Sequence, residues 1–268
     1  MAQPMYQKIA DDLRIKIEVG ELAAGEQLPT ELDLREKYEA SRNTIRDAIK
    51  RLTGLGLVET RPGQGTFVVQ KIDPFVTILT GDPELGSVGE SAAYLSEVSD
   101  VHRKARVTMP RVEIQAPPIE IGPRLRVEAD SQVISRHQQR FIDEIPWSLQ
   151  TSYYPMEFVT SGGALDLLKA EDMSKGVVKY LGEAMGIKQV GYRDWITART
   201  PDSNEQLFFR ISHDATVFEI FRTGFDQTGT PIRVTVTVFP ADRNHFIVNV
   251  GAVPGPQYEL PGPENKAA

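Results

Sequence analysis

The chain has 268 residues, a length that suggests one large domain or two ordinary ones. With 40% hydrophobic and 25% charged residues its composition is globular, and no run of about 18 apolar residues predicts a membrane span. The lack of cysteine excludes disulfides and thiolate chemistry, and the polar N-terminus, without a hydrophobic signal core, leads us to expect a cytosolic protein.

The net charge of −7 alone argues against a nucleic-acid partner, but the distribution of charge matters more than its total. Residues 1–70 carry 10 basic and 11 acidic side chains. Within residues 41–63, however, five basic side chains face only Asp47 and Glu59. The rest of the chain is acidic and repels phosphate. We expect this repulsion to limit non-specific DNA binding, because that binding comes from attraction to phosphates whatever the DNA sequence.

Two helices are predicted first along the chain. An apolar stripe from Tyr6 to Ile17 indicates the first helix, and Gly20 ends it as a plausible C-cap. Residues 30–33 resemble a capping box and begin the second helix. The apolar contacts expected from this short helix are Leu32, Leu34 and Tyr38.

Residues 41–52 predict a third helix suited to DNA. Ser41 is a good N-cap, and an apolar stripe follows it, formed by Ile45, Ala48, Ile49 and Leu52. The polar side chains expected on the opposite side are Asn43, Arg46, Asp47 and Lys50. Arg42 lies in the first turn. Two short helices joined by a tight turn form a helix-turn-helix pattern suited to the major groove. Taken alone, the stretch fits a solvated surface helix equally well.

A hairpin is predicted directly after this helix. Residues 57–61 and 66–69 have strand composition, and the glycine-rich residues 62–65 between them permit a tight turn. Such a hairpin is a wing, whose Gln64 could approach a minor groove and whose Arg61 could meet a phosphate. Turn geometry alone explains Gly63 and Gly65 at least as well as a direct contact.

These features together resemble the winged helix-turn-helix of the GntR family of bacterial transcription regulators. The matching pieces are Tyr6…Ile9-Ala10, Gly25…Leu28-Pro29-Thr30-Glu31, residues 41–48, Gly56-Leu57-Val58 and residues 63–68. The resemblance implies operator contacts by Arg42, Thr44 and Arg46, with Gly65 at the wing tip. Many members carry an arginine where this chain has Leu32, and Arg35 is a candidate substitute. The predicted DNA-binding residues are Arg35, Arg42, Asn43, Thr44, Arg46, Lys50, Arg61, Gln64 and Gly65.

The rest of the chain differs from the first 70 residues in composition and is rich in predicted strands. We expect a DNA-binding domain at 1–70, a linker at 71–89 with an apolar segment at 75–79, an effector-binding and dimerisation domain at 90–250, and a disordered tail at 251–268. A short helix is predicted at 91–98. The strands predicted beyond it are 106–114, 132–142, 147–154, 191–197, 216–225 and 232–239. Polar and apolar residues alternate along 233–238, as in a strand that has one face buried and the other face in solvent.

Helical patterns at 164–168 and 177–186 interrupt these strands, and this order predicts an α+β fold with an antiparallel sheet. It resembles the UTRA domain, the effector module of the HutC subgroup of GntR regulators. The resembling stretches are residues 133–140, 146–155, 196–199 with Glu205, 218–222, 229–233 and 241–243. The resemblance implies a chorismate-lyase-like fold that binds a small molecule without reacting it. The amino-acid sequence of residues 233–244 is similar to that of regulators from actinobacteria.

Polar side chains on the predicted strands are candidate effector contacts. Guanidinium groups gathered in a pocket suit a carboxylate or phosphate. The predicted effector-binding residues are Arg136, Arg140, Thr151, Tyr153, Arg199, Arg222, Arg233 and Thr235. Alternatively, the arginines pair with Glu205, Glu219 or Asp226, or lie on the outer face of the sheet. His137 is better explained as a half-exposed strand histidine than as a ligand contact.

Motifs for other chemistry are missing from the sequence. No two of its four histidines have helical metal spacing, and it contains no P-loop, GxGxxG or GxSxG motif, so we expect no metal, cofactor or catalysis. We predict a repressor that binds a palindromic DNA operator as a homodimer, has no membrane partner, and is released by a small-molecule effector, expected to be anionic. The alternatives are an enzyme with lyase-like activity in the second domain and a constitutive DNA-binding module without effector.

Overall fold

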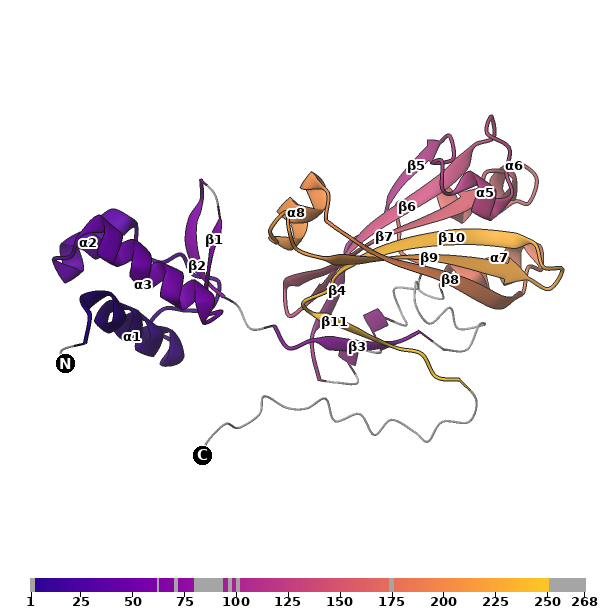
Figure 1. The fold of residues 1–268 in the computed structure, drawn as a ribbon. Helices are drawn as coiled ribbons and strands as arrows, with labels where there is room; N and C mark the ends of the chain where they lie inside the picture. The colour runs from indigo at the N-terminus through magenta and orange to yellow at the C-terminus, as the bar shows by residue number, and fades with distance from the viewer. Residues whose placement is uncertain are drawn as a thin grey trace. The chain divides into compact units, whose positions relative to one another are not determined.

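The computed structural model describes residues 3–61, 63–69, 72–79, 94–95, 98–99, 102–173 and 176–250. The chain divides into two compact units, Met1–Asp73 and Pro74–Ala268, and each is described by itself (Figure 1). The tail predicted at 251–268, most of the predicted linker, and five of the eight residues of the helix predicted at 91–98 lie outside the described residues.

The first unit contains the three predicted helices and the predicted hairpin. The helices are α1 (Met5–Glu18), α2 (Glu31–Tyr38) and α3 (Arg42–Gly54) (Figure 1). Strands β1 (Val58–Arg61) and β2 (Gly65–Val68) follow and pair antiparallel. A single bridge between Gln27 and Phe67 joins the connector after α1 to the hairpin. The winged helix-turn-helix architecture predicted from the sequence is therefore confirmed.

The apolar stripe of α3 forms the centre of this unit. Ile45, Ala48 and Leu52 are fully buried, in one cluster with residues of α1, α2 and the hairpin. One predicted contact of α2 is wrong, because Leu32 is 58% exposed while Leu34 is buried. Two residues at about 100° each place Leu32 nearly opposite Leu34 around the helix, so both cannot face the core.

Side-chain caps set where α2 and α3 begin. The Thr30 hydroxyl accepts a bond from the Asp33 N–H at 3.2 Å, and the Asp33 carboxylate accepts one from the Thr30 N–H at 3.0 Å, which completes the predicted capping box. The Ser41 hydroxyl accepts a bond from the Thr44 N–H at 3.2 Å. Both predicted caps are confirmed, and the Ser41 cap follows directly on the tight turn between the two helices.

The second unit is built on a seven-stranded sheet in the order β4-β6-β7-β10-β9-β8, with β5 also paired to β6 (Figure 1). Every pairing in it is antiparallel, as predicted. The strands are β4 (Ala105–Val107), β5 (Arg111–Gln115), β6 (Val133–Ile142), β7 (Ile145–Pro155), β8 (Gln189–Arg199), β9 (Val217–Asp226) and β10 (Pro231–Pro240). The strand predicted at 106–114 is thus two strands, separated at Pro110, which has no N–H to donate.

Several short elements were not predicted. They are the helices α5 (Gly122–Leu125), α6 (Glu157–Thr160) and α8 (Ser203–Phe209), and a two-stranded parallel sheet of β3 (Phe75–Ile78) and β11 (Asn244–Ile247). The two predicted helical patterns are the 3-10 helix η1 (Leu165–Leu168) and α7 (Val177–Met185), and α7 ends at Gly186 in the left-handed conformation, as predicted.

Strand β10 is buried on both faces. The prediction that only one of its faces is buried is therefore wrong. Arg233, Thr235 and Thr237 are as inaccessible as the valines between them. On the valine side, residues of α5 pack against Val234 and Phe221. On the other side, Phe246 of β11 packs near Ile220 and Phe239. Covering elements far away in sequence therefore removed the solvent face that the alternation suggested.

Candidate DNA-binding and effector sites

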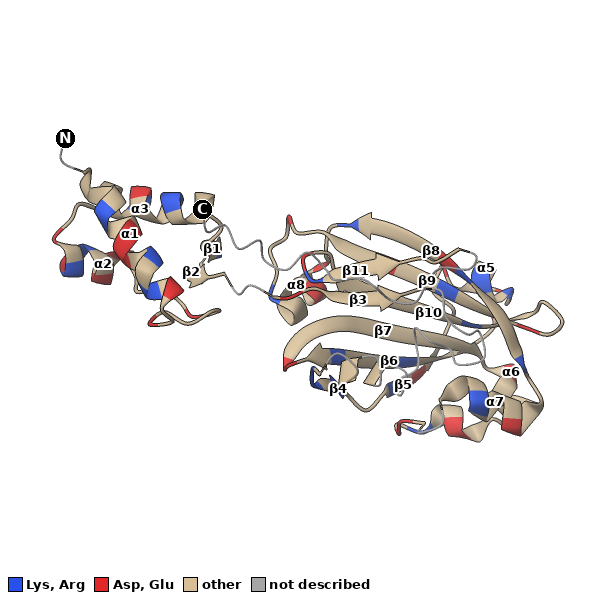
Figure 2. Cartoon of the chain, turned by 90° about the horizontal axis from the view of Figure 1, so that it is seen from below, with Lys and Arg blue, Asp and Glu red and all other residues tan. Residues whose placement is uncertain are grey.

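The polar side of α3 is exposed and borders a groove. Arg42, Asn43, Arg46, Asp47 and Lys50 all lie in solvent. A groove of about 870 Å³ separates this side from the hairpin. Its lining residues are Glu31, Asn43, Arg46, Asp47, Ile49, Lys50, Thr53, Gly54, Thr60 and Thr66. Lysine and arginine are spaced along α3 in Figure 2. The helix thus presents cations on the side that its core packing leaves free.

Glu31, the first residue of α2, contacts two predicted DNA-binding arginines. Its carboxylate accepts a bond from Arg42 Nε at 3.0 Å and lies 3.8 Å from Arg46 Nε. The two arginine side chains are still 68% and 65% exposed. One carboxylate therefore orients two guanidinium groups without covering them. The sequence places Glu31 beside a helix cap, and it gives no signal that α3 lies within reach.

The remaining predicted residues of the helices differ in exposure. The Thr44 hydroxyl lies 2.8 Å from the Ser41 hydroxyl and is partly buried, so it helps to close the first turn of α3. Arg35 is exposed on α2 and forms no ion pair with any residue that the structure describes.

The wing is held by contacts within the first unit. Arg61 pairs with Glu59 and stacks 4.4 Å from the centre of the Phe67 ring. Gln64 is exposed, and its carbonyl accepts a bond from Gln27 Nε2 at 2.9 Å. Gly65 has a φ of +121°, and a Cβ there would lie 2.3 Å from Gln27 Nε2. The geometry of the wing itself therefore requires a glycine at 65. Pro62 lies outside the described residues.

The predicted effector residues lie on two faces of the sheet. Residues opposite each other in an antiparallel pair share a face. Arg136 lies opposite Ser152, Ser152 opposite Thr235, and Thr235 opposite Arg222. Five of the predicted residues share this face, which we call the arginine face: Arg136, Arg140, Arg222, Arg233 and Thr235. Thr151, Tyr153 and Arg199 belong to the opposite face.

The arginine face is buried and polar. Arg136 donates to the carbonyls of Leu167, Lys169 and Glu171 at 2.6–2.8 Å. Arg222 forms a bidentate pair with Asp194 at 2.6 and 2.7 Å and also donates to the Leu79 carbonyl.

Arg140 lies 4.7 Å from the centre of the Tyr94 ring, and Arg233 donates to Gln189 at 3.1 Å. Several guanidinium groups are thus held on one desolvated surface, an environment that strengthens their attraction for an anion.

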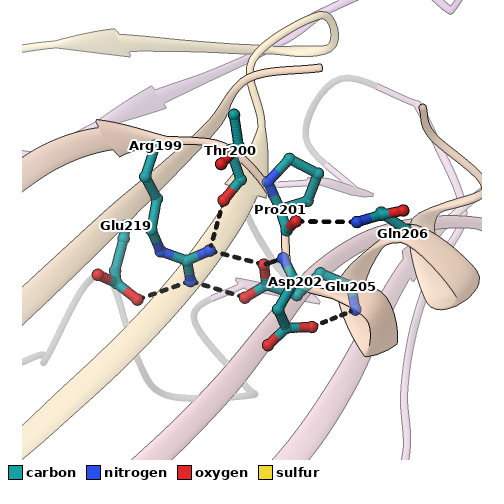
Figure 3. A network of polar contacts seen from close by, with 7 residues as sticks. All are labelled: Arg199, Thr200, Pro201, Asp202, Glu205, Gln206 and Glu219. Atoms are coloured by element: carbon teal, nitrogen blue, oxygen red, sulfur yellow. Dashed lines mark hydrogen bonds and ion pairs between the residues drawn. The ribbon is translucent and has the colours of Figure 1, made fainter. Parts of the chain in front are cut away.

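Arg199 belongs to a separate network, shown in Figure 3. Its two terminal nitrogens bind both oxygens of Glu205 at 2.7 Å, and one of them also reaches Glu219 at 2.7 Å. Glu205 closes a capping box with Asp202 at the start of α8. The hydrogen bonds that Arg199 donates to Glu205 hold the pKa of Arg199 above its usual value. These contacts favour the alternative that Arg199 pairs with carboxylates inside the protein.

Side chains on the face opposite the arginine face are half-buried. His137 Nδ1 lies 2.9 Å from the Thr151 hydroxyl, and burial lowers the pKa of His137, with Arg111 contributing. Burial likewise raises the pKa of Tyr153, with a smaller contribution from Glu113. His137 thus sits as a strand histidine with a local partner.

The described residues contain neither a metal-binding cluster nor a membrane-spanning helix. No three histidine or acidic side chains there are placed to hold a metal ion. No helix there has the length and apolar character needed to cross a membrane.

Comparison with known proteins identifies both units. Residues 5–68 match the family of bacterial regulatory proteins of the gntR family, and residues 101–245 match the UTRA domain. The chain is 22% identical to the HTH-type transcriptional regulator GmuR of Bacillus subtilis, over 91% of this chain and 96% of GmuR.

A further relative from Escherichia coli strain K12 is named "Probable fructoselysine utilization operon transcriptional repressor" and is 25% identical, over 90% of this chain and 92% of the relative. A solved GntR-family transcriptional regulator superposes with a TM-score of 0.58 at 24% identity, covering 94% of this chain and 99% of that one.

The fold and the exposed basic helix define a DNA-binding transcription regulator with a separate effector domain. The chain belongs to the GntR-type regulators that carry a UTRA domain. The matched families and relatives are regulators and not enzymes, so the enzyme alternative is set aside.

Proposed function

We propose that this protein is a ligand-responsive repressor that binds a palindromic operator as a homodimer and is released by a small-molecule effector. The observation that carries the proposal is the exposed, Glu31-oriented pair Arg42 and Arg46 on a capped helix, in a chain that also contains a UTRA domain. We place it in the HutC subgroup with regulators of actinobacterial type. Since its partner is DNA, we place its action in the cytoplasm.

In the proposed complex, α3 enters the major groove. Asn43, Arg46 and Lys50 line the groove beside the hairpin and would meet base edges or phosphates, because arginine and asparagine offer bidentate donors. The residues proposed to support them on the backbone and in the minor groove are Arg35, Arg42, Thr44, Arg61, Gln64 and Gly65. Two such helices in a dimer would lie about one helical turn of DNA apart.

The effector is proposed to bind on the arginine face. Arg140, Arg233 and Thr235 are buried there and come from two strands, β6 and β10, which both pair with β7. A carboxylate or phosphate suits these groups. Thr151, Tyr153 and Arg199 cannot join the same pocket, because the sheet separates them from it. An effector can weaken DNA binding only through its different affinity for the two states of the protein, and a coupling of about 1–3 kcal/mol corresponds to a change of roughly 5- to 150-fold.

The substitution Arg46→Ala tests the DNA-binding assignment. We expect it to abolish binding to duplexes from the region upstream of the gene in a gel-shift assay, with the melting temperature unchanged. The matched control is Arg51→Ala, which removes an exposed arginine of the same helix that does not line the groove. Unchanged DNA affinity of Arg46→Ala would refute the assignment. A metabolite screen that never shifts melting would favour the constitutive alternative.

A further inference from the structure

A second cavity lies on the sheet face opposite the arginine face. It has a volume of about 300 Å³ and lies beside α5, so we call it the α5 cavity. The lining side chains that matter here are Arg124, Arg126, Arg193, Trp195, Phe221 and Phe225. They come from α5 and the residue after it, from β8 and from β9. Figure 2 shows basic residues at α5, beside these two strands.

The three arginines of the α5 cavity have no carboxylate partner among the described residues. Arg124 Nη1 donates to the Glu120 carbonyl at 2.6 Å, and Arg126 Nη1 reaches the Gly229 carbonyl at 3.4 Å. No acidic side chain lines the cavity. By contrast, Arg199 and Arg222 on the same sheet are neutralised by carboxylates. In a chain with a net charge of −7, three guanidinium groups without a counter-ion at one cavity form a local anion-attracting site.

Aromatic rings form the rest of the cavity. The guanidinium of Arg124 lies 4.3 Å from the centre of the Phe221 ring, and that of Arg193 lies 5.6 Å from the centre of the Phe225 ring. Such stacking orients the planar groups and leaves their N–H edges available. Trp195 is 62% exposed, although an indole ring is large and mainly apolar. A planar ligand that stacks on Trp195 would remove this surface from water.

We propose that the α5 cavity binds a small molecule in which a carboxylate or phosphate is attached to a planar ring. The arginines would hold the anion through charge-assisted hydrogen bonds, and the aromatic rings would contact the planar part. The cavity is at the lower end of the range for ligand pockets, which suits a compact aromatic acid. This site is separate from the proposed effector site, because β9 and its neighbours lie between them, and it does not depend on the proposed repressor function.

The test is calorimetric titration of the full chain with benzoate, phenyl phosphate and inorganic phosphate, with tryptophan fluorescence as a second signal. Saturable binding of benzoate or phenyl phosphate is expected, with a change in fluorescence that Trp195→Phe removes. The double variant Arg126→Gln/Arg193→Gln should keep its melting temperature, since both side chains are exposed, and bind at least about tenfold more weakly. Arg111→Gln, an exposed arginine on β5, is the matched control and should bind normally.

Three outcomes would overturn the proposal: no saturable binding of either aromatic probe, equal affinity in the double variant, or a change of oligomeric state in the double variant without probe binding, which would assign the surface to a subunit contact. Inorganic phosphate binding as tightly as phenyl phosphate would overturn the requirement for a planar ring. Gel shifts of the double variant should match those of the unmodified chain, which separates this test from that of the repressor function.

Discussion

Arginines in this protein differ in role because of the groups beside them. Arg136 and Arg222 are surrounded by carbonyl and carboxylate oxygens and hold the sheet and its covering segments together. Arg42 and Arg46 share a single carboxylate and keep most of their surface in water. A guanidinium group can bind a second molecule only when some of its N–H donors are not already bonded. The oxygen atoms around each arginine therefore decide whether it can bind a ligand.

Glu31→Gln should increase non-specific DNA binding. The substitution removes the negative charge beside two exposed arginines, so attraction to any phosphate backbone rises while the orientation needed for specific contact is lost. Titration of random and operator duplexes at several salt concentrations measures both effects. We expect tighter binding of random duplex and a smaller ratio of specific to non-specific affinity.

Glu36→Gln makes the same charge change at an exposed position of α2 without a contact to either arginine. If both variants behaved alike, net charge would explain the result and the role of Glu31 in orientation would be rejected.

Gly65→Ala should destabilise the wing. The backbone at φ +121° is rarely adopted by residues with a Cβ, and the new methyl group would also clash with Gln27. A loss of roughly 1–3 kcal/mol is expected, measured by urea unfolding. Adding Gln27→Ala should recover only the part due to the clash.

Gly54→Ala is the control, because its Cβ would meet nothing and alanine favours a helix. Equal stability of Gly65→Ala and the unmodified chain would contradict the strained conformation.

Helices and strands in the second unit are joined by specific polar networks. Arg199 at the end of β8 links α8, through Glu205, to β9, through Glu219 (Figure 3). Glu205 is almost completely buried, and a buried carboxylate without a cation is costly. The short helix α8 therefore depends on a strand residue for its charge balance as well as on its own capping box.

Arg199→Gln should lower the free energy of unfolding by roughly 2–3 kcal/mol, less than for a fully buried pair, because Arg199 is 33% exposed. Arg199→Lys should restore only part of this, since lysine cannot form the bidentate contact. Urea unfolding of the three proteins checks the order. Unchanged stability in Arg199→Gln would contradict the structural role.

At the scale of the whole molecule, an acidic chain carries a small basic surface. The excess of acidic over basic residues lies in the second unit and the tail, since residues 1–70 are nearly balanced. We therefore expect general attraction to DNA to be weak, and we propose that binding comes from a few cations placed on α3 and the wing. Such a regulator should depend on two copies of the helix acting together.

Lys50→Gln tests this dependence on a dimer. Each phosphate contact contributes about 0.9 to the slope of log affinity against log salt, so loss of one contact in each of two subunits should reduce the slope by about 1.8. Filter binding or fluorescence anisotropy over a salt series measures it. A reduction of about 0.9 would indicate a single bound subunit, and no reduction would remove Lys50 from the interface.

The sequence by itself determined the local features of this protein. Helix stripes, the capping box at Thr30, the N-cap at Ser41, and the hairpin after α3 depend on residues a few positions apart, whose spacing and chemistry are visible in one stretch of chain. The antiparallel sheet was predictable for the same reason, from strand composition and turns.

The tertiary structure decided everything that depends on distant neighbours. It alone paired β3 with β11, brought Glu31 to Arg46, covered both faces of β10, and separated Arg140 and Arg233 from Arg199 by the thickness of a sheet. Alternation along a strand shows that side chains point to two sides, but a shift of one residue in register exchanges those sides. Which residues share a pocket is therefore fixed by pairing between strands, and that pairing is set by the packing of the whole domain.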